Sequence, residues 1–94
     1  MIVGFAARGL EIFHRTGLTT GVQPRHAGKL ARVLAALDAA AAPDDLGLPG
    51  FELRAPKGRD GGWSILVAGD WHVTFDFTGP GVGRVDYVGH GPPA

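Results

Sequence analysis

Arginine, lysine and histidine residues recur in the C-terminal half of the chain in a set that suits chemistry on an anionic substrate. Arg54 and Lys57 lie three residues apart, and His72 and His90 follow further along the chain. A guanidinium and an ammonium stabilise negative charge, and an imidazole transfers protons near neutral pH. Cleavage of an RNA phosphodiester uses this set most directly. We therefore treat Arg54, Lys57, His72 and His90 as candidate catalytic residues.

Three cations of the same region could hold RNA. Lys57 and Arg59 lie in an expected turn between two strands, and Arg84 begins the last expected strand. Alone, such a turn is more often the solvated tip of a hairpin. Its position beside the candidate catalytic residues favours a role for Lys57, Arg59 and Arg84 in RNA binding.

The remaining histidines and the aromatic residues point to structure rather than chemistry. The four histidines, at positions 14, 26, 72 and 90, form no i, i+4 pair and face no recognisable carboxylate cluster, so we expect no metal site. His14 and His26 lie among polar neighbours, and we expect both to be solvated surface residues without a role. Four aromatic residues could stack on RNA bases, but their alternating placement favours the core: Trp63, Trp71, Phe75 and Phe77.

Changes in hydrophobic period divide the chain into helices followed by strands. Residues 1–6 are expected to form a short strand and residues 8–15 a short helix. Pro24 suits the first turn of a longer helix whose apolar residues recur every three or four positions as far as Ala41. Alternating residues then predict four strands, at 51–55, 63–67, 71–77 and 84–88. This β-α-α-β-β-β-β order predicts an α+β fold with both N-terminal helices on one face of a small, mostly antiparallel sheet.

The connection between the strands at 63–67 and 71–77 decides which residues share a face. A two-residue turn pairs Ala68 with Trp71 and mixes apolar residues of one strand with polar residues of the next. A three-residue connection pairs Val67 with Trp71 and gathers the large apolar residues on one side, which burial favours. The opposite face then carries the polar set, joined by His90 if extension continues: Arg54, Ser64, His72, Thr74, Asp76 and Arg84.

Length and charge limit the classes of function. Ninety-four residues allow a single domain, 1–94, and the nine basic residues balance nine acidic ones. Zero net charge gives no overall field for gathering polyanions, so binding to nucleic acid must rest on a local patch or on a larger complex. The chain has no cysteine, which excludes disulfides and a cysteine nucleophile. It shows neither a signal peptide nor a membrane-spanning run, so we expect a cytoplasmic protein.

Motifs along nearly the whole chain resemble those of one protein family. They include Gly9-Leu10-Glu11-Ile12-Phe13, Thr19-Thr20-Gly21-Val22, Leu48-Pro49-Gly50-Phe51, Pro56-Lys57-Gly58, Trp63-Ser64-Ile65, Trp71-His72-Val73-Thr74-Phe75 and Val85-Asp86-Tyr87. On these motifs the chain resembles the HigB-type killer toxins of the RelE superfamily, which belong to type II toxin-antitoxin systems.

The resemblance implies a RelE-like fold and a ribosome-dependent endoribonuclease, or mRNA interferase. Such an enzyme cuts mRNA in the decoding site, inhibits translation and arrests growth. The resemblance also implies a helix-turn-helix antitoxin (HigA-like) as partner. It implies that the ribosome and mRNA are further partners, and that the toxin contacts operator DNA only indirectly, through the antitoxin. The expected reaction is attack of a ribose 2′-OH on the adjacent phosphate, with no metal and no cofactor.

The chain departs from the family pattern at several expected site positions. The family usually has His at the position of Arg54, Arg at the position of His72, and an acidic-Tyr pair near Gly89 and His90, whereas Lys57 matches. A permuted site explains the exchange between 54 and 72, with either histidine as base or acid. The alternative is a catalytically impaired toxin-fold protein that binds an antitoxin without cleaving RNA.

Overall fold

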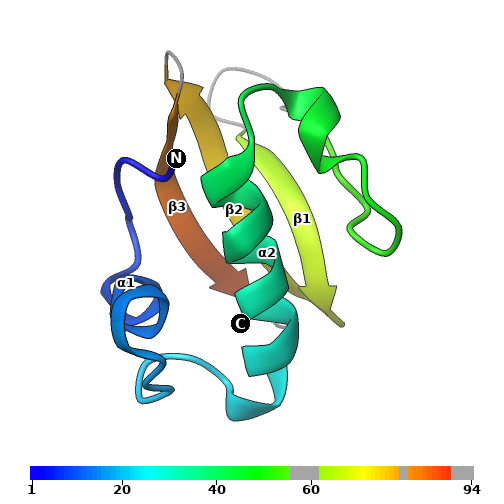
Figure 1. The fold of residues 1–94 in the computed structure, drawn as a ribbon. Coiled ribbons are helices and arrows are strands. Elements are labelled where there is room, and N and C mark those ends of the chain that lie inside the picture. Colours follow the sequence, from blue (N-terminus) through cyan, green and yellow to red (C-terminus); the bar gives the residue numbers. More distant parts are fainter. Residues whose placement is uncertain (56–61, 79–80, 90–94) are drawn as a thin grey trace.

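A computed structural model describes residues 1–55, 62–78 and 81–89 of the chain. Two α-helices and a three-stranded antiparallel sheet of order β1-β2-β3 form its regular structure. The sheet lies behind α2, with α1 beside it along β3 (Figure 1). This arrangement confirms the predicted α+β class with helices on one face of the sheet. The elements are α1 (Arg8–Thr16), α2 (Ala27–Ala39), β1 (Trp63–Ala68), β2 (Trp71–Thr78) and β3 (Gly81–Gly89), with short 3-10 turns at Pro24–His26 and Pro43–Leu46.

The helices form where the apolar spacing predicts them. α1 buries Leu10 and Phe13 and ends at Gly17, whose φ of 81° needs a residue without a side chain. α2 buries four residues that recur at helical spacing and line its sheet-facing side: Leu30, Val33, Leu34 and Leu37. The helix ends at Ala39, two residues earlier than the apolar pattern predicts: Ala40 is extended, and the N–H groups of Ala41 and Ala42 donate to the Asp45 carboxylate instead of to helix carbonyls.

The β1–β2 hairpin combines the two connections that the sequence allows. Ala68 pairs with Trp71, so the turn itself has two residues, and the expected pairing of Val67 with Trp71 is wrong. The register then shifts between Leu66 and Ala68, and from Leu66 onward it is the register that a three-residue connection gives, with Leu66 opposite His72. The irregularity at Val67 therefore lets a tight turn coexist with a register that places Trp63, Ile65, Val73 and Phe75 on the same face.

Two expected strands are present only as isolated bridges at the sheet edges. The N-terminal segment lies parallel to β3, with bridges from Ile2 to Val82 and from Phe5 to Val85. The segment expected to form a strand at 51–55 forms one bridge to β1, between Arg54 and Ser64, and its Phe51 carbonyl accepts a hydrogen bond from Leu66 N–H. Glu52, at φ 46°, interrupts that pairing because a left-handed residue breaks the extended backbone.

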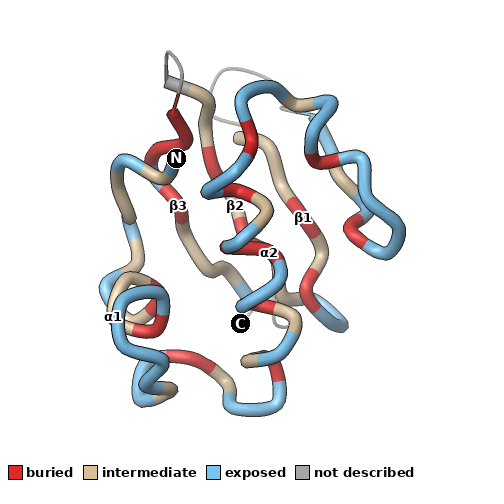
Figure 2. The backbone as a smooth tube through the Cα atoms, in the orientation of Figure 1, coloured by how far each residue is buried: buried red, intermediate tan, exposed pale blue. Residues whose placement is uncertain are grey.

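The core lies between the helices and one face of the sheet. Figure 2 shows buried positions along the side of α2 and along all three strands. From the sheet, Ile65, Val73, Phe75, Val82 and Val85 are almost completely inaccessible to solvent. In the part of the chain that the structure describes, no helix has the length and apolar character that crossing a bilayer requires.

Candidate functional site

The sheet face that the helices leave uncovered carries a row of polar residues across all the strands. Arg54 pairs with Ser64, Ser64 with Thr74, and Thr74 with Asp86. Cross-strand partners point to the same side of a sheet, so these four side chains share one face. The neighbouring row holds Leu66, His72 and Val88. Arg54 and His72 therefore lie on the same face in adjacent rows, as the register argument predicts. We call this surface the polar sheet face.

His72 is fixed by the turn that precedes its strand. Its Nδ1 lies 3.1 Å from the carbonyl oxygen of Asp70. A carbonyl can only accept a hydrogen bond, so Nδ1 carries the proton and Nε2 is the basic nitrogen of the neutral ring. The ring is half-buried, which limits its freedom to turn. This hydrogen bond therefore favours the neutral tautomer of His72 with the proton on Nδ1.

The polar sheet face is less cationic than the sequence suggests. The Arg84 guanidinium forms a 2.7 Å ion pair with Asp76, so its charge is already compensated within the face. Asp86 adds a second carboxylate beside Thr74. Arg84, Asp76 and Asp86 border an open pocket of about 420 Å³ together with Gly62 and Thr74. Strand alternation places Asp86 on this face, and that signal was available in the sequence.

Three expected site residues lie outside the described part of the chain. These are Lys57, Arg59 and His90, so the structure gives no geometry for them. Arg54, in contrast, is exposed at the outer edge of the row. Among the described residues, no group of three or more His, Asp or Glu side chains could hold a metal ion.

His26 occupies a position that its polar neighbours did not predict. The sequence suggested a solvated residue, but His26 is buried, with 4% of its surface exposed. Its Nδ1 shares a 2.5 Å hydrogen bond with the Tyr87 hydroxyl. Burial lowers the pKa of His26, and the nearby charge of Arg25 lowers it further. Burial also raises the pKa of Tyr87, so both groups are neutral at physiological pH.

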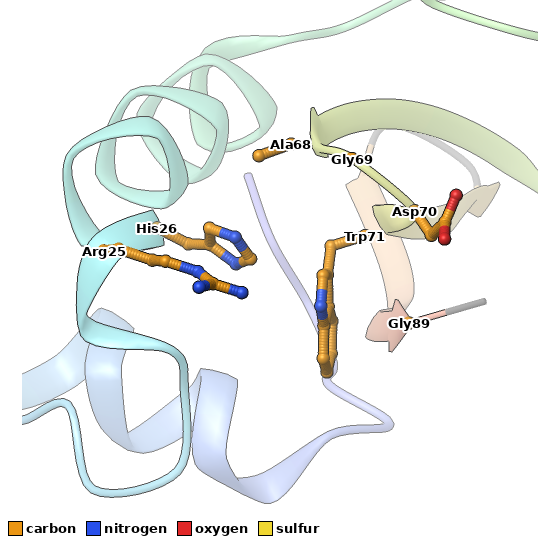
Figure 3. Close-up of a pocket in the computed structure, with 7 residues that line it drawn as sticks. All are labelled: Arg25, His26, Ala68, Gly69, Asp70, Trp71 and Gly89. Carbon is orange, nitrogen blue, oxygen red and sulfur yellow. The ribbon is translucent and has the colours of Figure 1, made fainter. Parts of the chain in front are cut away.

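An open pocket of about 640 Å³ lies next to His26 at the end of the sheet. Figure 3 shows the Arg25 guanidinium and the His26 ring on one side of it, facing the Trp71 indole on the other. The Asp70 carboxylate points away from this space (Figure 3). Trp71 was expected in the core, but its indole forms one wall of the pocket and is only partly buried.

Comparisons with known proteins place the chain among the toxins of toxin-antitoxin systems. Residues 3–89 match the family described as the RelE-like toxin of type II toxin-antitoxin system HigB. The chain is also 35% identical over 78 residues to the endoribonuclease HigB of Proteus vulgaris, an alignment that covers 82% of this chain and 85% of the relative. The chain therefore belongs to the HigB-like toxin family.

Proposed function

We propose that this toxin is a ribosome-dependent endoribonuclease that cleaves mRNA by attack of a ribose 2′-OH on the adjacent phosphate. The observation that supports it best is the placement of Arg54 and His72 in adjacent rows of the polar sheet face. The curated relative bears the name endoribonuclease, which supports the same class of reaction.

The proposed reaction needs three groups around the phosphate. A base takes the proton of the 2′-OH, whose oxygen attacks phosphorus. A cation stabilises the charge on the non-bridging oxygens, and an acid protonates the departing 5′ oxygen, leaving a 2′,3′-cyclic phosphate. Arg54 is the cation, and removing such a donor commonly costs about 3 kcal/mol of transition-state stabilisation. His72 Nε2 transfers one proton, a contribution of roughly 10² to 10⁴ in rate.

Lys57 and His90 complete the proposed catalytic set on sequence grounds. Lys57 adds a second cation, and His90 supplies the second proton-transfer group, so either His72 or His90 can be the base. Lys57, Arg59 and Arg84 also contact the RNA backbone in this proposal. Arg84 can do so because its exposed ion pair with Asp76 is worth only about 0–1 kcal/mol.

The wider setting follows from the family and from the charge balance. Zero net charge gives weak affinity for free RNA, so we propose that the ribosome holds and orients the message. A helix-turn-helix antitoxin (HigA-like) is the proposed partner, and it alone contacts operator DNA. We place the toxin in the cytoplasm, where its ribosomal target lies. Proton transfer by side chains needs no metal, so a chelator that spares the ribosomes should leave cleavage unchanged.

The test is cleavage of mRNA on purified ribosomes by variants at positions 54 and 72. Arg54→Ala and His72→Ala should each lower the rate by at least about 10², because each removes a group acting in the transition state. The double exchange Arg54→His with His72→Arg should retain more cleavage than either single exchange. Arg32→Ala is the matched control, since Arg32 is an exposed cation on α2 outside the polar sheet face.

These measurements test the site assignment and the ribosome dependence separately. A wild type that cleaves but loses less than about threefold in both alanine variants would refute the assignment of Arg54 and His72. Rapid cleavage of ribosome-free RNA would refute ribosome dependence. In each case the variants must bind the antitoxin as the wild type does, which shows that they are folded.

The competing function is a toxin-fold protein that binds its antitoxin without cleaving RNA. The observation that favours it is the pair of carboxylates on the polar sheet face, Asp76 and Asp86, which repel phosphate. It predicts that expression without the antitoxin leaves growth of a bacterial host normal and that no mRNA is cut on ribosomes. Growth arrest accompanied by cleavage would exclude it.

A further inference from the structure

Three aromatic rings meet at the end of the sheet and contact one another in pairs. The Trp71 and Tyr87 rings stack with centroids 4.5 Å apart and planes 29° from parallel. The His26 ring meets Trp71 edge-on at 5.9 Å and Tyr87 edge-on at 6.1 Å. The hydrogen bond between His26 and the Tyr87 hydroxyl closes the triangle. We call His26, Trp71 and Tyr87 the aromatic triangle.

The aromatic triangle joins the start of α2 to β2 and β3, two strands that also pair with each other in the sheet. His26 precedes the first residue of α2, Trp71 begins β2, and Tyr87 lies near the end of β3. The Trp71 indole also lies over its cross-strand partner Gly89, where an added Cβ would come within 2.8 Å of the indole carbons. The start of β2 is therefore held from both sides, by the helix layer and by β3.

His72 follows Trp71 in β2, so its side chain points to the opposite face of the sheet. Both residues follow the two-residue turn, and the carbonyl of Asp70 in that turn fixes His72 Nδ1. Trp71 lies between Asp70 and His72 in the chain, so a shift of its backbone changes the position of the Asp70 carbonyl relative to the His72 ring. The geometry of the triangle is thus transmitted to the tautomer and the orientation of His72.

We infer that His26 and Tyr87 are positioning residues that hold the Trp71 end of β2, and with it His72, in place for proton transfer. This inference rests on the proposed ribonuclease function, in which His72 is the group that moves a proton. The His26 and Tyr87 side chains are turned toward the helix side of the sheet and are not proposed to touch RNA, although the Tyr87 backbone N–H donates to the Asp86 carboxylate. They act through Trp71 and the turn at residues 69–70.

The experiment uses two readouts, one of which does not depend on activity. Tyr87→Phe removes the hydroxyl and keeps the ring stack, and His26→Leu removes the imidazole. His26→Asn places an amide group near the position of Nδ1 and is the rescue variant. Nitrogen NMR of His72 in the free protein reports which ring nitrogen carries the proton. Rates on ribosomes give kcat and KM for each variant.

We expect the Nδ1-protonated form of His72 to dominate in the wild type and to be mixed with the other tautomer in Tyr87→Phe and His26→Leu. Because small displacements of a catalytic group are costly, kcat should fall about 10-fold with KM within about twofold. His26→Asn should recover kcat to within about threefold of the wild type. Leu46→Ala, at the buried last residue of the 3-10 turn Pro43–Leu46, is the control that destabilises the fold at another place.

A folded Tyr87→Phe variant with the wild-type tautomer of His72 and wild-type kcat would overturn the inference. Equal losses in Leu46→Ala and Tyr87→Phe would also overturn it, because they would show a general effect of stability. If the wild type does not cleave at all, the proposed function fails, while the tautomer of His72 still decides whether the aromatic triangle positions it.

Discussion

Alanine substitution at the two helical glycines, Gly9 and Gly28, should change the stability of the protein in opposite directions. Gly9 lies in α1 and Gly28 lies in α2. Replacing a helical glycine by alanine normally raises the free energy of unfolding by up to about 1 kcal/mol, because alanine restricts the unfolded chain and favours the helix. A Cβ at Gly28 would meet no atom within 4 Å, so the gain there is unopposed.

At Gly9 the same Cβ has no room. It would lie 2.6 Å from the Gly21 carbonyl oxygen and 2.8 Å from its Cα, both backbone atoms that cannot rotate away. Overpacking of this kind costs typically about 1–3 kcal/mol, which exceeds the helix gain. We therefore expect Gly9→Ala to be destabilising by about 1 kcal/mol in net terms. Gly21→Ala lies outside a helix and lacks the compensating gain, so it should cost more.

Thermal unfolding followed by circular dichroism measures these differences. For a domain of this size, 1 kcal/mol moves Tm by roughly 4–8 °C. Gly28→Ala should raise Tm by a few degrees, whereas Gly9→Ala should lower it by roughly 4–8 °C. An increase in Tm for Gly9→Ala equal to that of Gly28→Ala would refute the reasoning, because it would mean that α1 and the loop at Gly21 do not touch.

Three further predictions concern titration and the core. Because the pKa of His26 is lowered in the folded state below its ordinary 6.5, the unfolded chain binds more protons as the pH falls. Stability measured by urea unfolding should therefore decrease from about pH 7.5 to pH 5.5, with a smaller decrease in His26→Asn. Two backbone N–H groups lower the pKa of Asp45, so its contribution is present above its ordinary 3.8 and is lost in acid. Asp45→Asn should be less stable than the wild type at pH 7, and the difference should shrink as the pH falls below 3.8 and the carboxylate takes up its proton. Leu37→Ala, at a fully buried position, should cost about 2–5 kcal/mol, and Leu48→Ala, at 46% exposure, less than about 0.5 in the same assay.

The sequence predicted the helices and the faces of the sheet well because both depend on burial. The four apolar residues of α2 recur with the helical period, and only one face of that helix can meet the sheet. The same demand for burial selected the correct register from Leu66 to Trp63. It could not select the turn, because the irregularity at Val67 reconciles a tight turn with that register, and such irregularities leave no trace in an alternating pattern.

The local hydrophobic pattern could not predict how the edge segments pair or which polar side chains contact each other. Residues 51–55 alternate as a strand should, yet the left-handed conformation of Glu52 reduces their pairing to one bridge. A glutamate in the sequence does not predict a left-handed conformation. His26 has polar neighbours in the sequence, but its burial comes from Trp71 and Tyr87, more than 40 positions away. The hydrogen bond between His26 and Tyr87 spans 61 residues, which no local pattern can encode.

The charges on the polar sheet face bear on how the proposed reaction is driven. Arg54 and Arg84 are balanced by Asp76 and Asp86, so the described part of the face has no net charge while His72 is neutral. Such a face cannot gather RNA from a distance, since long-range attraction scales with net charge. Precise placement of a bound message can lower a barrier by about 7–11 kcal/mol, far more than one surface charge contributes. A site with balanced charges therefore acts efficiently on a message that another particle holds in position, and this is the physical reason to expect cleavage on ribosomes and little on free RNA.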